Sequence, residues 1–233
     1  MDAVELLQAK VADIDNIEVF VAKTKYPQGG EKQLIDAVMK RQVKSMGLPI
    51  DVGAVVQNVA TSLAVYEAVQ KNMPLITNVM TITGDCLPME NQHNYKFRIG
   101  MPLSYIAEVA GGIPEKAVKI ISGGPMMGFA QEDLSACTVK GTNSILCLTN
   151  AQNGESKEEV TCIRCGECLK VCPMNLQPLY LYAYEKKENV DALNRLNVLD
   201  CIECGCCSYA CPGKLPLVER FRNGKRLVKE GNK

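Results

Sequence analysis

The sequence predicts an α/β fold in the first part of the chain and a smaller α-helical, cysteine-rich domain after it. Three observations support this division. The first seventy residues alternate between helical and strand-like spacing of apolar side chains, and residues 75–112 are rich in strand patterns. Nine cysteines, eight of them at a repeated spacing, lie from Cys162 to Cys211. A chain of 233 residues is long enough for one or two domains, which agrees with such a split.

The first seventy residues predict three helices and two strands. Apolar residues recur every three or four positions in some segments and alternate in others. This alternation favours a parallel sheet covered by helices, although so few strands make an incomplete sheet. The expected helices are residues 2–12, 31–40 and 61–71, and the expected strands are residues 17–21 and 54–56.

Beyond residue 75 the pattern changes to strands separated by turns. The sequence Gly123-Gly-Pro-Met-Met-Gly128 predicts a turn, and the polar run at residues 151–160 predicts a linker. A helical pattern at residues 179–196 separates the two halves of the cysteine-rich segment. The expected strands are residues 79–83, 95–99, 119–122 and 144–148, with a helix at residues 103–110.

Composition excludes several classes of function. Lys plus Arg and Asp plus Glu both number 26, so no overall charge attracts nucleic acid, and no nucleic-acid partner is expected. No apolar run approaches the roughly 20 residues that span a bilayer, and no secretory signal opens the sequence, so we expect no transmembrane segment and a reducing compartment. Twelve cysteines in such a compartment point to metal binding rather than to disulfides.

The cysteine spacing indicates iron–sulfur clusters. Cys162-Ile-Arg-Cys165-Gly-Glu-Cys168-Leu-Lys-Val-Cys172-Pro follows the bacterial ferredoxin pattern, and Cys201-Ile-Glu-Cys204-Gly-Cys-Cys207-Ser-Tyr-Ala-Cys211-Pro repeats it 39 residues later. In proteins with two such runs, the last cysteine of each run ligates the other cluster. We therefore predict two [4Fe-4S] clusters, one held by Cys162, Cys165, Cys168 and Cys211, the other by Cys201, Cys204, Cys207 and Cys172.

Zinc is the alternative to iron at these cysteines. Pairs of cysteines two residues apart also bind zinc, but zinc does not require a third cysteine at the same interval in both runs. Cys206 is expected not to be a ligand, because its use in place of Cys207 would shift the spacing, and Cys86, Cys137 and Cys147 are expected to be buried packing residues. No catalytic residue is predicted, because His93 is the only histidine and no nucleotide-binding loop is present.

Several further stretches resemble the C subunit of the Rnf electron-transport complex, a relative of the flavoprotein subunit of respiratory complex I. They are residues 25–35, 55–61, 81–84 and 121–128, together with both cysteine runs. The resemblance implies a peripheral subunit on the cytoplasmic face of the cell (inner) membrane, which takes electrons from NADH. Its implied partners are the other subunits of the complex, including membrane subunits that move sodium ions or protons and an iron–sulfur subunit.

The resemblance also implies a flavin-facing role for Glu31, Asn58 and Thr61, although a Gly-Gly-Glu turn that caps a helix needs no flavin. The glycine-rich flavin and NADH loop of the family has no counterpart here, so we expect a shortened form that binds FMN only with the missing N-terminal segment. The implied fold is α/β with an incomplete flavin-domain-like sheet and a β-grasp insertion, followed by a two-cluster ferredoxin-like domain. The expected domains are residues 1–74 (flavin/NADH type), 75–115 (β-grasp), 116–150 (return strands of the first domain), 151–160 (linker), 161–216 (two-cluster domain) and 217–233 (basic tail).

Two other functions compete with the relay subunit. One is a flavin-dependent cobalamin reductase of the propanediol-utilisation kind, which is built on a similar plan. The other is a stand-alone ferredoxin-like carrier whose N-terminal half is inert. As a component of an ion-translocating oxidoreductase, which the resemblance implies, the chain is not expected to be catalytic alone.

Overall fold

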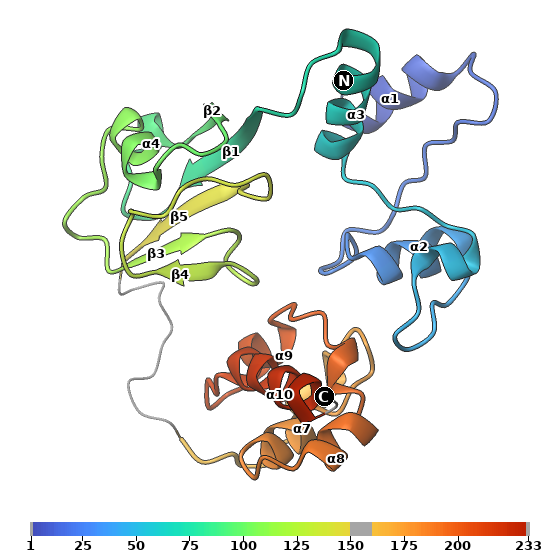
Figure 1. Cartoon of the computed structure of the whole chain (residues 1–233), viewed down its shortest axis with the longest axis vertical. Helices are drawn as coiled ribbons and strands as arrows, with labels where there is room; N and C mark the ends of the chain where they lie inside the picture. The colour runs from blue at the N-terminus through green and yellow to red at the C-terminus, as the bar shows by residue number, and fades with distance from the viewer. Residues whose placement is uncertain (1, 150–159, 232–233) are drawn as a thin grey trace. The chain divides into compact units, whose positions relative to one another are not determined.

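A computed structural model describes residues 2–149 and 160–231, in two compact units (Figure 1). The first unit ends at Gln57 and the second begins at Asn58. The linker predicted at residues 151–160 falls, except for Val160, outside the described residues. None of the helices in the described part of the chain is long and apolar enough to cross a bilayer.

The first unit contains helices α1 (Ala3–Val11) and α2 (Glu31–Met39) and the 3-10 helix η1 (Pro49–Val52). Asp2 caps α1 by accepting a hydrogen bond from the backbone N–H of Glu5 at 2.9 Å. Aspartate is a preferred residue at the N-cap of a helix. Both predicted helices are confirmed, and α2 buries one side chain, Ile35.

The strands predicted at residues 17–21 and 54–56 are wrong. In the structure these residues have no regular secondary structure and pair with no strand, and none of residues 2–57 forms one. Val21 is 59% exposed and Val55 is 74% exposed, although Ala54 is buried. Alternating side chains make a strand only where a neighbouring strand accepts its hydrogen bonds, and no described segment does so here.

The second unit opens with helix α3 (Val59–Lys71), which is capped by Asn58 and buries none of its side chains. A single five-stranded mixed sheet follows, in the order β2-β1-β5-β3-β4 (Figure 1). β1 pairs antiparallel with β2 and parallel with β5, and β3 lies antiparallel to both β5 and β4. The strands are β1 (Thr77–Thr83), β2 (His93–Arg98), β3 (Lys119–Ser122), β4 (Phe129–Gln131) and β5 (Ser144–Leu148), with α4 (Leu103–Val109) after β2 and a short 3-10 helix η2 (Met89–Asn91) before it.

The sheet packs against α4 to form the first hydrophobic core. Met80 and Ile82 of β1 and Ile145 of β5 are fully buried against Leu103 and Ile106 of α4. Cys86 and Cys147 are buried in the same core, as expected, whereas Cys137 is exposed, contrary to expectation. The strands of residues 116–150 had been expected to return to the first domain. They pair instead within the sheet that β1 and β2 begin, so residues 77–148 share one sheet.

The cysteine-rich segment folds into short helices around a second hydrophobic core. The single helix predicted at residues 179–196 is divided by a turn at residues 186–189. Residues 217–233 are predicted as a basic tail, and through Gly231 they form an amphipathic helix whose Leu217, Phe221 and Val228 are buried in this core. The helices are α6 (Glu167–Lys170), α7 (Pro178–Glu185), α8 (Val190–Arg195), η3 (Val198–Asp200), α9 (Cys206–Ala210) and α10 (Leu217–Gly231).

Candidate metal centres

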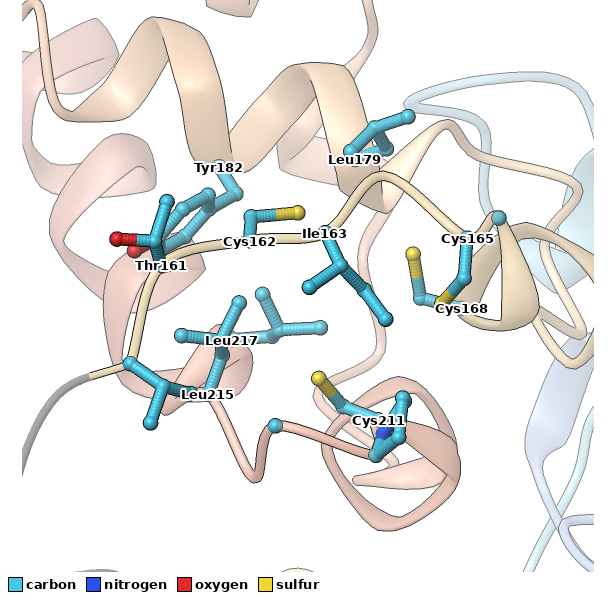
Figure 2. A pocket seen from close by; sticks show the side chains of 14 residues that line it. Thr161, Cys162, Ile163, Cys165, Cys168, Leu179, Tyr182, Cys211, Leu215 and Leu217 are labelled. Atoms are coloured by element: carbon cyan, nitrogen blue, oxygen red, sulfur yellow. The ribbon is translucent and has the colours of Figure 1, made fainter.

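Four cysteines from the two runs line one pocket of about 300 Å³. Three of them, Cys162, Cys165 and Cys168, come from the first run, and Cys211 is the last cysteine of the second (Figure 2). Apolar side chains such as Ile163 and Leu217 form much of the remaining wall. The structure thus brings together the four residues predicted to share a cluster.

The reciprocal four cysteines line a second, tighter pocket of about 20 Å³. Cys201, Cys204 and Cys207 of the second run meet Cys172, the last cysteine of the first run, and Cys206 lines the same pocket. A set of thiols is chemically suited to iron in both pockets. The first pocket has room for a cluster, whereas in the second the side chains would have to move outward to admit one. In the described residues, no three His, Cys, Asp or Glu side chains could hold a single metal ion.

The two runs wrap their pockets with the same backbone conformation. Three pairs of residues, each 39 positions apart, have positive φ, which turns the chain sharply so that backbone N–H groups can face a common centre. Two backbone N–H groups already donate to cysteine sulfur, from Leu176 to Cys172 at 3.3 Å and from Glu203 to Cys201 at 3.4 Å. Such hydrogen bonds stabilise a thiolate ligand. The pairs are Arg164 and Glu203, Gly166 and Gly205, and Asn175 and Lys214.

Burial determines the ionisation of the free thiols. It raises the pKa of Cys168, Cys172 and Cys201, and it raises the pKa of Cys207 to about 12 and of Cys206 to about 11. Metal ligation requires the thiolate, so a bound cation must displace the protons of the ligand thiols.

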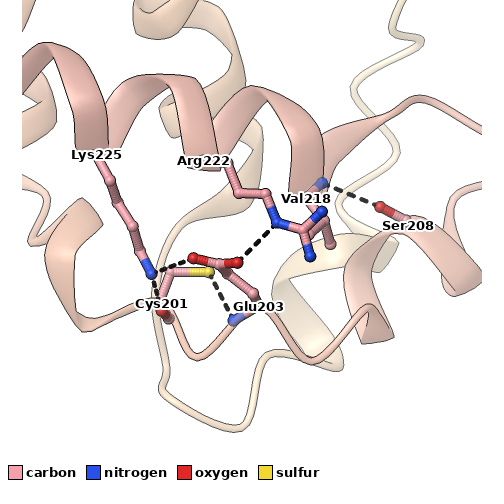
Figure 3. A network of polar contacts seen from close by, with 6 residues as sticks. All are labelled: Cys201, Glu203, Ser208, Val218, Arg222 and Lys225. Atoms are coloured by element: carbon pink, nitrogen blue, oxygen red, sulfur yellow. Dashed lines mark hydrogen bonds and ion pairs between the residues drawn. The ribbon is translucent and has the colours of Figure 1, made fainter. Parts of the chain in front are cut away.

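A polar network beside the second pocket was not foreseen from the sequence. Glu203, within the second cysteine run, pairs with Arg222 and Lys225 of α10 (Figure 3). Burial raises the pKa of Glu203, but the hydrogen bonds and charges of Lys225 and Arg222 outweigh burial and lower the pKa below its ordinary value. The signal that the sequence did contain is a charge difference between the repeats, because the position of Glu203 is occupied by Arg164 in the first run.

The residues considered for flavin binding have ordinary structural surroundings. Glu31 is the first residue of α2 in the first unit. Asn58, in the second unit, caps α3 by accepting a hydrogen bond from the N–H of Ala60 at 2.9 Å, and Thr61 is an exposed residue of the first turn of that helix. A flavin-facing role for these three residues stays a prediction.

Comparison with known families and proteins agrees with this arrangement. Residues 155–212 match the 4Fe-4S dicluster domain, residues 79–130 the SLBB domain and residues 1–67 the Nuo51 FMN-binding domain. The last match supports a relationship to the flavoprotein of complex I.

Three curated relatives are similar to almost all of this chain. It is 45% identical to the C subunit of the proton-translocating ferredoxin:NAD(+) oxidoreductase complex of Clostridium ljungdahlii, over 94% of this chain and 48% of the relative. It is 42% identical to the Na(+)-translocating counterpart of Acetobacterium woodii, over 97% of this chain and 51% of the relative. It is 38% identical to the C subunit of the ion-translocating oxidoreductase complex of Yersinia enterocolitica, over 98% of this chain and 32% of the relative.

The chain therefore spans about half the length of the first two of these relatives, and a third of the other. The resemblance to the C subunit of the Rnf complex is confirmed, and across nearly all of its own length the chain is a homologue of the C subunits of the ion-translocating oxidoreductase complexes.

Proposed function

We propose that the chain is an electron-transfer subunit of a membrane-associated Rnf-type complex. The observation that carries this proposal is the exchange of the last cysteines, by which each pocket combines three thiols of one run with one thiol of the other. When bound there, two [4Fe-4S] clusters supply one-electron transfer. The match to the dicluster domain and the names of the relatives support the same role.

The ligands that we propose follow the two pockets. Cys162, Cys165, Cys168 and Cys211 hold one cluster, and Cys172, Cys201, Cys204 and Cys207 hold the other. The protein contributes apolar walls, backbone N–H donors to sulfur and two loops with left-handed residues that keep the cysteines facing inward. Because both sites belong to one small domain with a common core, an electron has a short path between them.

The sheet of residues 77–148 is, in our proposal, the β-grasp module of the family. Its strand order, with β1 parallel to β5 at the centre and a helix after the first hairpin, is the support for this assignment. The module would then extend beyond the 75–115 expected from sequence. Residues 1–67 match the Nuo51 FMN-binding domain, which supports a flavin-facing role for Glu31, Asn58 and Thr61.

The proposed partners and location follow from the relatives. Their names describe ion-translocating complexes that connect ferredoxin and NAD. We place the chain at the cytoplasmic face of the inner membrane as a peripheral subunit, in contact with membrane subunits and an iron–sulfur subunit. NADH or ferredoxin would exchange electrons with the whole complex.

Double alanine variants of the full chain test the exchanged ligands. If Cys172 and Cys201 share a cluster, Cys172→Ala combined with Cys201→Ala removes one cluster and leaves about four iron atoms. The matched pair, Cys162→Ala with Cys172→Ala, damages both sites and leaves little iron. Low-temperature EPR after reduction with dithionite should show two interacting clusters in the wild type and one isolated cluster in the first variant. The opposite pattern of iron loss would contradict the assignment.

A further inference from the structure

Helix α10 contacts the second cysteine run through three short hydrogen bonds. The Lys225 ammonium donates to the backbone carbonyl oxygen of Cys201 and to Oε1 of Glu203, both at 2.6 Å. Arg222 Nε donates to Oε2 of the same carboxylate at 2.7 Å (Figure 3). The Lys225 side chain is only 18% exposed, so solvent screens its charge less than that of a surface lysine.

This arrangement cannot exist in the first half of the repeat. The position of Glu203 is held there by Arg164, and that of Arg222 by Ala183, each 39 residues earlier. Lys225 does have a counterpart in sequence, Lys186, but a lysine and an arginine cannot form an ion pair with each other. The two halves therefore share a backbone plan and differ in the charges placed beside their cysteines.

We propose that Lys225 is a positioning residue that fixes the Cys201–Glu203 loop and, together with Glu203, sets the reduction potential of the second site apart from that of the first. The inference rests on the proposed function, because it requires clusters in both pockets. Lys225 acts on the cluster through the loop and through its charge, and it is not itself a ligand.

The sign of the effect follows from electrostatics. Reduction by a low-potential one-electron donor adds one negative charge to the site, and a nearby cation stabilises that charge. Loss of Lys225 should therefore lower the potential. Loss of the Glu203 charge leaves two cations without their counter-ion and should raise the potential. A purely structural role predicts no such opposition, because either change would only loosen the same loop.

The test compares variants of the full chain by EPR-monitored redox titration. Lys225→Met keeps the aliphatic stem, and Glu203→Gln keeps the shape of the carboxylate. Lys225→Arg retains the charge and should restore the wild-type potential. Arg226→Met is the matched control, because it removes one positive charge from the same helix at a side chain that is 60% exposed and paired with Glu230.

We expect Lys225→Met to make the equilibrium constant for reduction of one cluster about tenfold less favourable. This corresponds to a midpoint potential about 59 mV lower for one electron, and the potential of the other cluster should stay nearly unchanged. Glu203→Gln should raise the same midpoint potential. Arg226→Met should shift this potential less than Lys225→Met or Glu203→Gln does. Shifts of the same sign in Lys225→Met and Glu203→Gln, or no shift, with both clusters present would overturn this inference alone. If Lys225→Met loses iron, the upward shift in Glu203→Gln still decides the question. A wild-type chain without clusters would overturn the proposed function and this inference together.

Discussion

Five cysteine side chains line the second pocket, although a [4Fe-4S] cluster takes four ligands. Cys206 and Cys207 are adjacent in α9, so their side chains leave the helix in different directions. Cys207 is buried in the core of the domain with Cys162, Cys168, Cys201 and Cys211, and it keeps the spacing of the first run, whereas Cys206 is half-buried.

This difference gives a prediction with its own control. Cys207→Ala should lose the second cluster, so that iron falls from about eight to about four atoms per chain. Cys206→Ala should keep all of the iron, because it removes no ligand. Iron analysis of both variants decides the matter, and loss of iron in Cys206→Ala alone would exchange the roles of the two residues.

A carboxylate that lines neither cysteine pocket contributes to the stability of the sheet. Asp85, after β1, accepts hydrogen bonds from the side chain and the backbone N–H of Thr149, after β5. The hydrogen bond from the Thr149 side chain is the main cause that lowers the pKa of Asp85 below its ordinary value of 3.8. A lowered pKa stabilises the folded chain above the ordinary value, and this contribution is lost as the pH falls through the folded value.

Asp85→Asn should therefore unfold at a lower temperature than the wild type at pH 7, and the difference should shrink as the pH falls below 3.8. Thermal unfolding followed by circular dichroism across this range measures the effect. A difference that stays constant with pH would mean that the charge of Asp85 plays no part.

At the scale of elements, the parallel pairing of β1 with β5 depends on a glycine at the end of β1. Gly84 has a φ of +142°, and a Cβ at this position would lie 1.8 Å from the carbonyl oxygen of Cys147 in β5. A side chain would have to push the strands apart. This close approach accounts for the glycine in the Thr81-Ile-Thr-Gly84 stretch.

Gly84→Ala should destabilise the sheet by about 1–3 kcal/mol or more, because both the backbone conformation and the contact are unfavourable for alanine. Gly141→Ala is the control, since nothing lies within 4 Å of its added Cβ, and its effect should stay within about 0.5 kcal/mol. Hydrogen exchange of the β1 and β5 amides reports the change locally. Equal protection in both variants would contradict this account of Gly84.

Sequence patterns predicted some elements well and others poorly, for physical reasons. Helices α1, α2, α3 and α4 were found because helical hydrogen bonds are local and the side-chain spacing records them. The predicted strands at residues 17–21 and 54–56 failed because a strand also needs a partner, which no single segment reveals. β4, only Phe129–Gln131, is too short to show a period.

For the candidate site, the sequence predicted the grouping of the cysteines but not the polar contacts beside them. The grouping of the eight cysteines in the two pockets is the one that the spacing predicted. The contacts of Lys225 and Arg222 with Glu203 were not foreseen, because they join residues 22 and 19 positions apart and depend on how α10 packs. The buried face of α10 was not recognised from the sequence, because many basic residues lie between its apolar positions.

At the scale of the whole molecule, we expect the domain with the eight candidate ligands to depend on bound clusters for folding more than the sheet does. Several of the candidate ligands belong to its hydrophobic core, whereas the core of the sheet contains none of them. Metal binding to such a site is coupled to folding.

Removal of iron by oxidation and chelation should therefore loosen α7 and α10 while the sheet of residues 77–148 persists. Hydrogen exchange before and after removal measures this, with the amides of β1 and β5 as the internal reference. Equal loss of protection in both regions would show that the two cores unfold together.

The iron and acid-labile sulfide content of the anaerobically purified full chain shows whether it holds two four-iron clusters. We expect about eight iron and about eight sulfide per chain. Zinc in place of iron, or iron without sulfide, would contradict this expectation.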